Sequence, residues 1–520
     1  MSTLAILSAT FLSLSLSLSL IWILFRSKIT SPLTKWPLVG HFASLIFSNL
    51  EINDYAAYLL GLSGHTAHLK GPSFTGIEFV LTSNPENIHY ICGSNTSNYY
   101  RGEHYKDVFE IWGDGILVAE SQWWKFQRRL NHSLVRQSGF MSLVENATNQ
   151  MLKDGLLPIL DRAAELGFWV DMQDLSRRFT LELTCKFLLG IDLDSLSVDL
   201  PEVPFSKAIE DMEEAIFYRH LKPLRLWKLQ RWLGIGVEGK STKAKAILDE
   251  FVYRQISLKR DKIACKEGKE DEDLDMLSRF MAVREEALSH DQQAHNPNKD
   301  TSAKVMSDRF LRDSVVNMLT AGRDTTSVAF AWFFWLVSTH PSIEAKLRQE
   351  LKEAFHLKEG DKWPYPSYQA MSKLVFLHGA LCEALRLYPP VPFNRRTAIG
   401  PDTLPSGHRV DKGKEIIIST YTLGRMESVW GSDCLEFKPE RWISDKGGIV
   451  HVTSNKFNAF SAGANQCLGK ELAMLEMKMV AAAVVWNYHF EVVEGHSVDA
   501  DSSIMYYMKH GLKVHVAKKV

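Results

Sequence analysis

The residues Phe460-Ser-Ala-Gly-Ala-Asn-Gln-Cys-Leu-Gly469 place one cysteine between two glycines, directly before an apolar helical pattern that runs from Lys470 to Tyr488. A cysteine just before a helix lies at the positive end of the helix dipole, where unpaired backbone N–H groups can donate to its sulfur. Both effects lower the pKa of a thiol and stabilise a thiolate. Gly463 and Gly469 also allow the backbone to approach a flat partner closely. The stretch therefore favours Cys467 as an anionic sulfur ligand.

A thiolate of this kind suits the iron of a porphyrin, because it pushes electron density onto the metal and favours O–O cleavage. The alternative interpretation is a buried structural cysteine in a glycine-rich turn, and the ten residues alone do not separate the two. The remaining cysteines form no CxxC pair and have no zinc-like spacing. We expect reduced thiols in a cytosolic domain at Cys92, Cys185, Cys265, Cys382 and Cys434.

A second segment, Ala321-Gly-Arg-Asp-Thr-Thr-Ser327, lies in the middle of an apolar helix predicted from about Ser307 to His340 and ended by Pro341. Glycine, aspartate and two threonines are locally unfavourable there, and such exceptions are expected at functional sites. A threonine hydroxyl that bonds the preceding turn can loosen a helix and leave a groove for dioxygen and water. Asp324 and Thr325 would then deliver protons as general acids. The alternative is a helix kink with satisfied hydroxyl groups.

The third segment, Glu383-Ala-Leu-Arg386, is followed by two prolines that end its helix. A glutamate and an arginine three residues apart share a helix face, and such a pair is usually a solvated salt bridge that contributes little. A sharper interpretation adds Arg441 from Lys438-Pro-Glu-Arg-Trp442. Two guanidinium groups around one carboxylate would form a buried lock with a structural role.

The fourth segment, Trp124-Lys-Phe-Gln-Arg128, places a tryptophan and an arginine four residues apart on one helical face. The indole N–H of Trp124 and the charge of Arg128 could both bind a haem propionate. Taken alone, the segment is better explained as an ordinary amphipathic helix.

Hydrophobic periodicity predicts a mainly α-helical fold with a small β part. Apolar residues recur every three or four positions through 145–190, 205–260 and 308–340. The polar stretch 264–301 is interpreted as a surface excursion within one domain.

Three stretches are typical of β-strands. Phe79-Val-Leu81 and Glu415-Ile-Ile-Ile-Ser-Thr420 are short and rich in β-branched or aromatic residues. A further strand region is expected over Ile504–Val516, where Lys509-His-Gly-Leu512 would form the turn of a terminal hairpin.

The N-terminal residues predict a membrane anchor. No residue from Leu4 to Phe25 is charged, and about 20 apolar residues suffice for a helix to cross a bilayer. Arg26, Lys28 and Lys35 follow and would hold that flank in the cytosol. A cleaved secretory signal fits less well, because no basic region precedes the apolar run. The predicted organisation is an anchor at 1–25, a linker at 26–40 and a cytosolic catalytic domain at 41–520.

The bulk composition excludes little. The chain has 520 residues, of which 45% are hydrophobic and 23% charged, and a chain of this length can bury a large core without disulfides. The formal net charge of -1 at pH 7 gives no argument for nucleic acid as a partner.

The four segments occur in the order found in cytochrome P-450 monooxygenases, and the chain resembles that family from Trp36 to its C-terminus. The family pattern Phe-x-x-Gly-x-Arg-x-Cys-x-Gly is matched at Phe460, Gly463, Cys467 and Gly469. The oxygen-binding helix motif and the structural triad of the family are matched at Ala321, Gly322, Asp324, Thr325, Thr326, Glu383, Arg386 and Arg441. The resemblance implies the cytochrome P-450 fold, here preceded by one transmembrane helix.

The same resemblance implies a cofactor and partners. Haem b would be bound through Cys467, and electrons would come from NADPH through a flavin-containing reductase. The enzyme would be a single-pass protein of the endoplasmic reticulum membrane that acts on a small hydrophobic substrate. Lys125, Arg129 and Lys470 lie near the expected sulfur side of the haem, so they are candidates for docking an acidic reductase.

One residue departs from the family pattern. Asn465 stands where the family usually has an arginine that binds a haem propionate. Asparagine can donate a hydrogen bond but carries no charge. Two outcomes stay open: a weaker affinity for haem, or a charge supplied by Arg395 or Arg396 beside Trp124 and Arg128.

The resemblance also narrows the substrate class. Ala331-Trp-Phe-Phe-Trp-Leu336 and Pro390-Val-Pro-Phe-Asn394 resemble the plant subgroup that hydroxylates fatty acids and long-chain alkanes, which also includes enzymes that couple phenols in alkaloid biosynthesis. Hydroxylation of a long-chain aliphatic is the first hypothesis, and oxidation or phenol coupling of a ring-containing metabolite is the second. A haem-thiolate isomerase or dehydratase is a remote third, because Asp324-Thr325 is intact. The substrate pocket is expected to include Ala321, Val391, Phe393 and Tyr506.

Overall fold

The computed structural model of the protein describes residues 40–41, 50–72, 75, 77–137, 139–265, 275–282 and 307–519. The predicted anchor at 1–25, and all of the linker except residue 40, lie outside these residues. Among the residues described, no helix is both long and apolar enough to span a membrane. Of the polar stretch 264–301, only 264–265 and 275–282 are described, and the second piece is a mostly buried helical segment.

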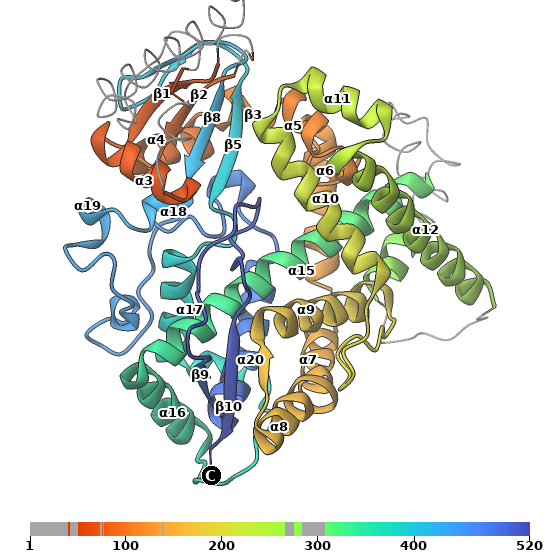
Figure 1. The fold of residues 1–520 in the computed structure, drawn as a ribbon, viewed down its shortest axis with the longest axis vertical. Helices are drawn as coiled ribbons and strands as arrows, with labels where there is room; N and C mark the ends of the chain where they lie inside the picture. The colour runs from red at the N-terminus through yellow and green to blue at the C-terminus, as the bar shows by residue number, and fades with distance from the viewer. Residues whose placement is uncertain are drawn as a thin grey trace, which may run out of the picture.

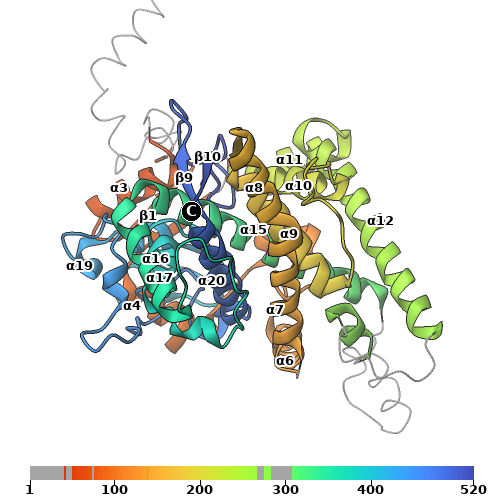
Figure 2. The ribbon, with the colours of Figure 1, turned by 90° about the horizontal axis from the view of Figure 1, so that it is seen from below.

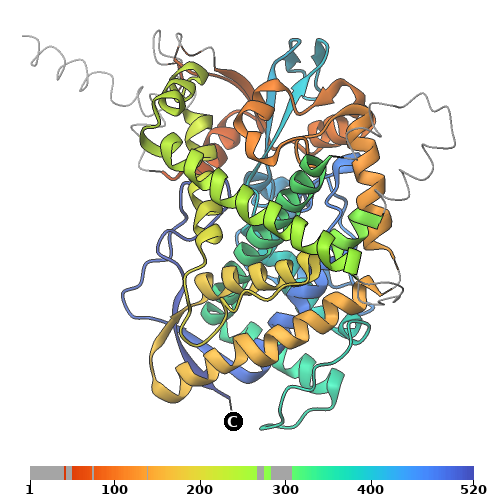
Figure 3. The ribbon, with the colours of Figure 1, turned by 90° about the vertical axis from the view of Figure 1, so that its right-hand side faces the viewer.

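Helices make up most of the structure, as the periodicity predicts (Figure 1). Their bounds are α3 Ile52–Leu62, α4 Pro85–His89, α5 Glu103–Val108, α6 Ser121–Val135, α7 Phe140–Met151, α8 Leu157–Leu166, α9 Met172–Leu189, α10 Pro204–Leu221, α11 Leu224–Leu233, α12 Gly236–Cys265, α15 Asp308–Thr339, α16 Pro341–Phe355, α17 Val375–Leu387, α18 Thr420–Leu423, α19 Glu427–Trp430 and α20 Lys470–Asn487. Seen from below, α6 to α9 lie between α16, α17 and α20 on one side and α10 to α12 on the other (Figure 2). The side formed by α10, α11 and α12 faces the viewer in Figure 3.

A five-stranded sheet forms the small β part. Its strand order is β1 (Thr66–Lys70), β2 (Glu78–Thr82), β8 (Glu415–Ser419), β5 (Phe393–Ala398) and β3 (Tyr99–Tyr100). The two strands predicted around residues 79–81 and 415–420 are confirmed, and they pair in parallel with Leu81 opposite Ile417. The strands β6 (Asp402–Thr403) and β7 (Arg409–Val410) form a separate two-stranded sheet.

The predicted terminal hairpin is wrong. The last strand, β10 (Lys513–Lys518), pairs with β9 (Tyr488–Val492) and with β4 (Trp169–Asp171), whereas residues 504–512 form no strand with it. The Asp171 carboxylate accepts the Leu512 backbone N–H at 2.9 Å and fixes where β10 begins. The partner of β10 therefore lies far away in the sequence, where local patterning gives no sign of it.

The helix α15 crosses the middle of the molecule (Figure 1) and positions the site. It follows Ser307, whose side chain accepts the Phe310 N–H at 3.2 Å, and it ends at Thr339 before Pro341, as predicted. Gly322 allows α9 to approach closely, because a Cβ there would lie 2.7 Å from the Thr184 hydroxyl oxygen. The mainly α fold with a small β part is thus confirmed.

Candidate active site

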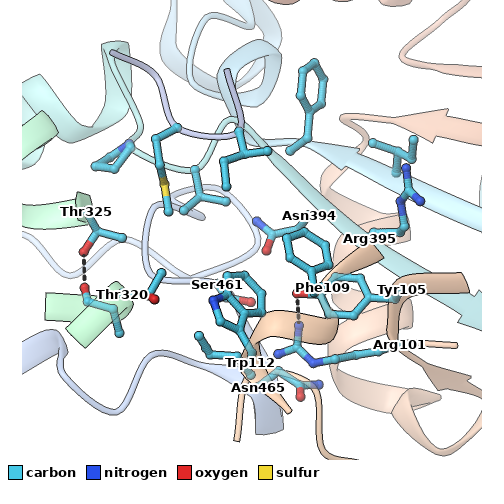
Figure 4. Close-up of a pocket in the computed structure, with 18 of the residues that line it drawn as sticks. Arg101, Tyr105, Phe109, Trp112, Thr320, Thr325, Asn394, Arg395, Ser461 and Asn465 are labelled. Carbon is cyan, nitrogen blue, oxygen red and sulfur yellow. Dashed lines mark hydrogen bonds between the residues drawn. The ribbon is translucent and has the colours of Figure 1, made fainter. Parts of the chain in front are cut away.

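A cavity of about 1010 Å³ lies between α15, the β5 strand and the loop that precedes α20. Figure 4 shows Arg101, Tyr105, Phe109 and Trp112 along one wall of the cavity. Thr320 and Thr325 of α15 line another part of the same cavity. Nine of the predicted site residues line this cavity: Trp124, Arg128, Ala321, Thr325, Val391, Phe393, Phe460, Cys467 and Gly469.

The cysteine loop directs its sulfur into the cavity. The short turn Gly463–Asn465 and the start of α20 at Lys470 enclose Cys467, whose backbone N–H donates to the Phe460 carbonyl at 2.8 Å. Cys467 is exposed, and it lines the cavity. Among the described residues, it is the one cysteine that lines this cavity.

The thiol pKa differs from the sequence expectation. Burial raises the pKa of the Cys467 thiol, and this effect outweighs the Gly469 backbone N–H, Arg128 and Lys470, which lower it. The predicted N–H donor and helix start are present, but the free thiol is not activated overall. A bound metal deprotonates a coordinating thiol outright, so ligation supplies what the local environment does not.

Gly463 has a different role from the one expected. Its φ is +61°, and a Cβ at this position would lie 1.8 Å from the Cys92 carbonyl oxygen of the π-turn Tyr90–Ser94. The glycine is therefore required by a close approach of two backbone segments, and it does not line the cavity.

The two predicted acid residues of α15 face different ways. Thr325 lines the cavity, and its hydroxyl donates to the Ala321 carbonyl at 2.8 Å, which is the predicted bond to the preceding turn (Figure 4). Asp324 is fully buried and does not line the cavity. Its carboxylate accepts from Arg323 at 2.6 Å and from the Tyr507 hydroxyl at 2.9 Å.

Basic groups gather near the cysteine loop. Arg128 of α6 donates to the Gln466 carbonyl at 2.9 Å, and its guanidinium carbon lies 5.5 Å from the centre of the Trp124 ring. Arg101 also lines the cavity and donates to the Tyr105 hydroxyl at 2.9 Å (Figure 4). The sequence reasoning missed Arg101, although its position directly after strand β3 could have indicated it.

The two arginines expected to replace the charge missing at Asn465 do not both line the cavity. Arg396 is buried, does not line the cavity and donates to the Arg395 carbonyl at 2.7 Å. Arg395 lines the cavity but pairs with Glu415 at 3.2 Å. Phe393, Asn394 and Arg395 of β5 line the cavity, whereas the buried Arg396 does not. Arg101 is thus the better candidate to carry the missing charge.

The predicted structural triad forms a buried cluster. Glu383 is fully buried and accepts from Arg386 at 2.6 and 2.8 Å and from Arg441 at 3.2 Å. Trp442 adds its indole N–H at 2.8 Å, and Lys438 adds its backbone N–H at 3.2 Å. The cluster joins α17 to the turn Pro439–Trp442 and does not line the cavity.

The predicted substrate residues are brought together with one exception. Ala321, Val391 and Phe393 line the cavity, but Tyr506 does not. Tyr506 is buried against Trp332, with ring centres 5.3 Å apart, and its carbonyl accepts the Trp332 indole N–H at 2.6 Å. The neighbouring residues Ile504 and Met505 line the cavity in its place.

The chemistry of these groups fits a haem. One thiol faces the cavity from the loop before α20, and the helix α15 borders the same cavity with the small residues Ala321 and Gly322. Arg101, Arg128 and the Trp124 indole provide two cations and an N–H donor for the two carboxylates of a porphyrin edge.

Comparison with known proteins agrees with this fit. Residues 31–510 match the family model described as cytochrome P-450. An alkane hydroxylase of Arabidopsis thaliana is 41% identical over 488 residues, which cover 94% of each chain. Noroxomaritidine synthase 2 of Narcissus pseudonarcissus is 36% identical over 488 residues, covering 93% of this chain and 91% of the relative. A crystal structure of a cytochrome P-450 has a TM-score of 0.71 and 20% sequence identity, over 90% of this chain and 98% of that chain. The family match and these relatives show that the chain belongs to the cytochrome P-450 family.

Proposed function

We propose that the protein hydroxylates a long-chain aliphatic substrate, an alkane or a fatty acid, with electrons from NADPH delivered by a reductase. The observation that carries this proposal is the 41% identity to an alkane hydroxylase over 94% of both chains. The large cavity supports it, because Ala321, Val391 and Ile504 give it apolar walls and pockets for hydrophobic ligands are mostly apolar.

The protein contributes positioning, proton delivery and exclusion of water. Bound haem supplies dioxygen activation and the oxidant that removes hydrogen from the substrate. Cys467 would hold the iron, and Trp124, Arg101 and Arg128 would hold the propionates, since all four line the cavity. Thr325 would hold a proton at its hydroxyl beside the oxygen-binding groove, with Asp324 behind it in the helix.

A second candidate is oxidation or coupling of a ring-containing substrate. Tyr105, Phe109 and Trp112 lie along one wall: Phe109 stacks on Trp112 with ring centres 4.4 Å apart, and Tyr105 is tilted against Phe109 at 4.3 Å. Aromatic walls favour aromatic guests, and noroxomaritidine synthase is 36% identical to this chain. The lower identity places this candidate second.

A substrate panel separates the two candidates. Microsomes that contain the protein and a plant reductase would be incubated with alkanes, fatty acids and phenolic alkaloid precursors, and products would be identified by mass spectrometry. Hydroxylated aliphatics that require NADPH would support the first candidate. Turnover of the phenolic precursors alone would replace it with the second.

We also propose the membrane and redox partners implied by the sequence. Residues 1–25 would anchor the protein in the endoplasmic reticulum membrane, with the catalytic domain in the cytosol. Lys125 and Arg129 are exposed on α6, and Lys470 begins α20 beside the cysteine loop. These cations would dock an acidic face of the reductase.

Replacing Thr325 by alanine is expected to uncouple NADPH use from product formation. The hydroxyl is then lost from the cavity wall, so fewer protons reach the groove and more peroxide escapes. We expect the ratio of peroxide to product to rise by roughly fivefold or more, since general acids contribute large rate factors. Measuring NADPH, peroxide and product together checks this, and Thr325→Ser, which keeps the hydroxyl, is the matched control. Unchanged coupling in Thr325→Ala would remove the proton-delivery role.

Replacing Arg101 by alanine is expected to weaken haem retention. Hydrogen bonds to charged groups contribute about 1.5–3 kcal/mol, so haem loss should be faster by about tenfold. Transfer of haem to an excess of a haem-scavenging apoprotein measures the rate. Arg396→Ala serves as the comparison, because Arg396 does not line the cavity. Equal rates in Arg101→Ala and the unchanged protein would show that Arg101 does not bind the propionate.

A further inference from the structure

Asp324 faces a buried polar cluster between α9, α10, α15 and the segment before β10. Arg323 and the Tyr507 hydroxyl both donate to the same carboxylate oxygen, Oδ1. The other oxygen, Oδ2, is buried and accepts no hydrogen bond from any described residue. Burying a carboxylate oxygen without a hydrogen-bond donor costs free energy. We therefore expect Asp324 Oδ2 to have a hydrogen-bond donor.

Glu213 of α10 closes the cluster opposite Asp324. Glu213 is 5% exposed, and Ser206 and Glu210 on the same helix accept from Arg323, the neighbour of Asp324, at 3.0 and 3.1 Å. Its Oε1 atom is also buried and, within the described part of the chain, has no hydrogen-bond partner. Neighbouring carboxylates in a buried site do not both ionise. One proton between them would satisfy both unpartnered oxygens.

The surroundings decide where that proton lies. Burial, followed by the charge of Asp324, raises the pKa of Glu213 well above its usual range. The fully buried Arg323 lies directly against Asp324 at 2.6 Å and balances its charge. The Arg177 guanidinium of α9 lies 4.0 Å from the centre of the Tyr507 ring and adds a second cation. Glu213 is therefore the favoured position for the proton.

A small second cavity lies between Glu213 and the wall of the main one. It measures about 10 Å³ and is lined by Glu213 and Thr320, and Thr320 also lines the main cavity. This volume is just large enough for one water molecule. The Thr320 hydroxyl donates to the Val316 carbonyl at 3.0 Å, so its remaining lone pair can accept from such a water.

We propose that Glu213 and Asp324 share one proton and that Glu213 is a proton donor for the oxygen-binding groove, reached past Thr320. This rests on the proposed monooxygenase function. The proton leaves the Glu213 carboxyl group for the water position in the small cavity, and it leaves behind a carboxylate flanked by Arg323 and Arg177. A proton from solvent restores the pair, on the side where the partly exposed Glu210 binds Arg323 at 3.1 Å.

Infrared difference spectroscopy on the resting, haem-loaded protein tests the shared proton without turnover. The unchanged protein minus Glu213→Gln should show the C=O stretch of a protonated carboxyl group at neutral pH, shifted in D₂O. Glu214→Gln, the next residue on the same helix and exposed to solvent, should leave that band in place. Absence of any Glu213-dependent band would overturn the proposal.

Turnover tests the donor role. Glutamine at position 213 keeps the volume and an N–H donor to Asp324 but cannot release a proton. Product formed per NADPH should fall by about threefold or more, with haem content and the urea midpoint unchanged, while Glu214→Gln keeps full coupling. Full coupling in Glu213→Gln would overturn the donor role. Failure of the monooxygenase proposal is recognised separately, because it removes NADPH-dependent product from the unchanged protein and leaves the infrared band.

Discussion

Protein in which Cys467 is replaced by serine is expected to show no red-shifted Soret band when it is reduced in the presence of carbon monoxide. That band reports thiolate ligation, and Cys467 is the cysteine that lines the cavity. A serine hydroxyl is a far weaker anionic ligand than a thiolate. Loss of a residue that merely supports a metal ligand costs about 10–100-fold, so loss of the ligand itself should reduce NADPH-dependent activity by more than this.

Cys434→Ser is the matched control for this substitution. Cys434 is a buried free cysteine whose backbone carbonyl, not its sulfur, accepts from Arg386. The same change of atom at this position should leave the red-shifted band intact. A band that survives in Cys467→Ser, or disappears in both variants, would refute the assignment of Cys467 as the ligand.

The sequence predicted what depends on local spacing. Cys467 before a helix, the long helix α15 and the spacing of Glu383 and Arg386 each depend on residues close together in the chain, so periodicity and motif place them correctly. Arg441 is more distant, and the family pattern, not geometry, identified it. The large cavity follows from these elements once they pack together.

Side-chain direction was harder to predict. Successive helical residues are about 100° apart, since a turn holds 3.6 residues, and so Thr325 faces the cavity while Asp324 faces α10. The motif predicts that both deliver protons to the groove. Side-chain direction also separates the arginines of β5, because Arg396 is buried away from the cavity and Arg395 pairs with Glu415. Local sequence does not give the register or rotation that decides such cases.

Contacts between segments that lie far apart in the chain could not be predicted from the sequence. Gly463 is required by the carbonyl of Cys92, which lies far upstream. Glu213 meets Asp324 only because α10 packs over α15, and no motif marked it. Glu476 of α20 lines the cavity, and burial raises its pKa to about 8, yet it belongs to an ordinary apolar helix pattern.

Replacing Glu383 by glutamine is expected to destabilise the fold by about 3–5 kcal/mol, the usual cost of breaking a buried ion pair. The amide keeps the shape of the carboxylate but removes its charge, and the fully buried Arg386 then has no counter-ion within the triad. Arg441 and the Trp442 indole donate to different oxygens of Glu383, so the amide nitrogen, which cannot accept, leaves one of these two donors without its acceptor. The urea midpoint of the haem-loaded protein measures the loss.

The matched control for Glu383→Gln is Glu165→Gln, which breaks the exposed pair of Glu165 and Lys518 at 2.9 Å. Exposed pairs contribute less than about 1 kcal/mol, so this variant should unfold at nearly the same urea concentration as the unchanged protein. The triad does not line the cavity, and therefore the Glu383→Gln molecules that remain folded should still give the red-shifted carbon monoxide band. A normal midpoint combined with a lost band would instead mean that Glu383 acts on the haem site, and the structural assignment would be wrong.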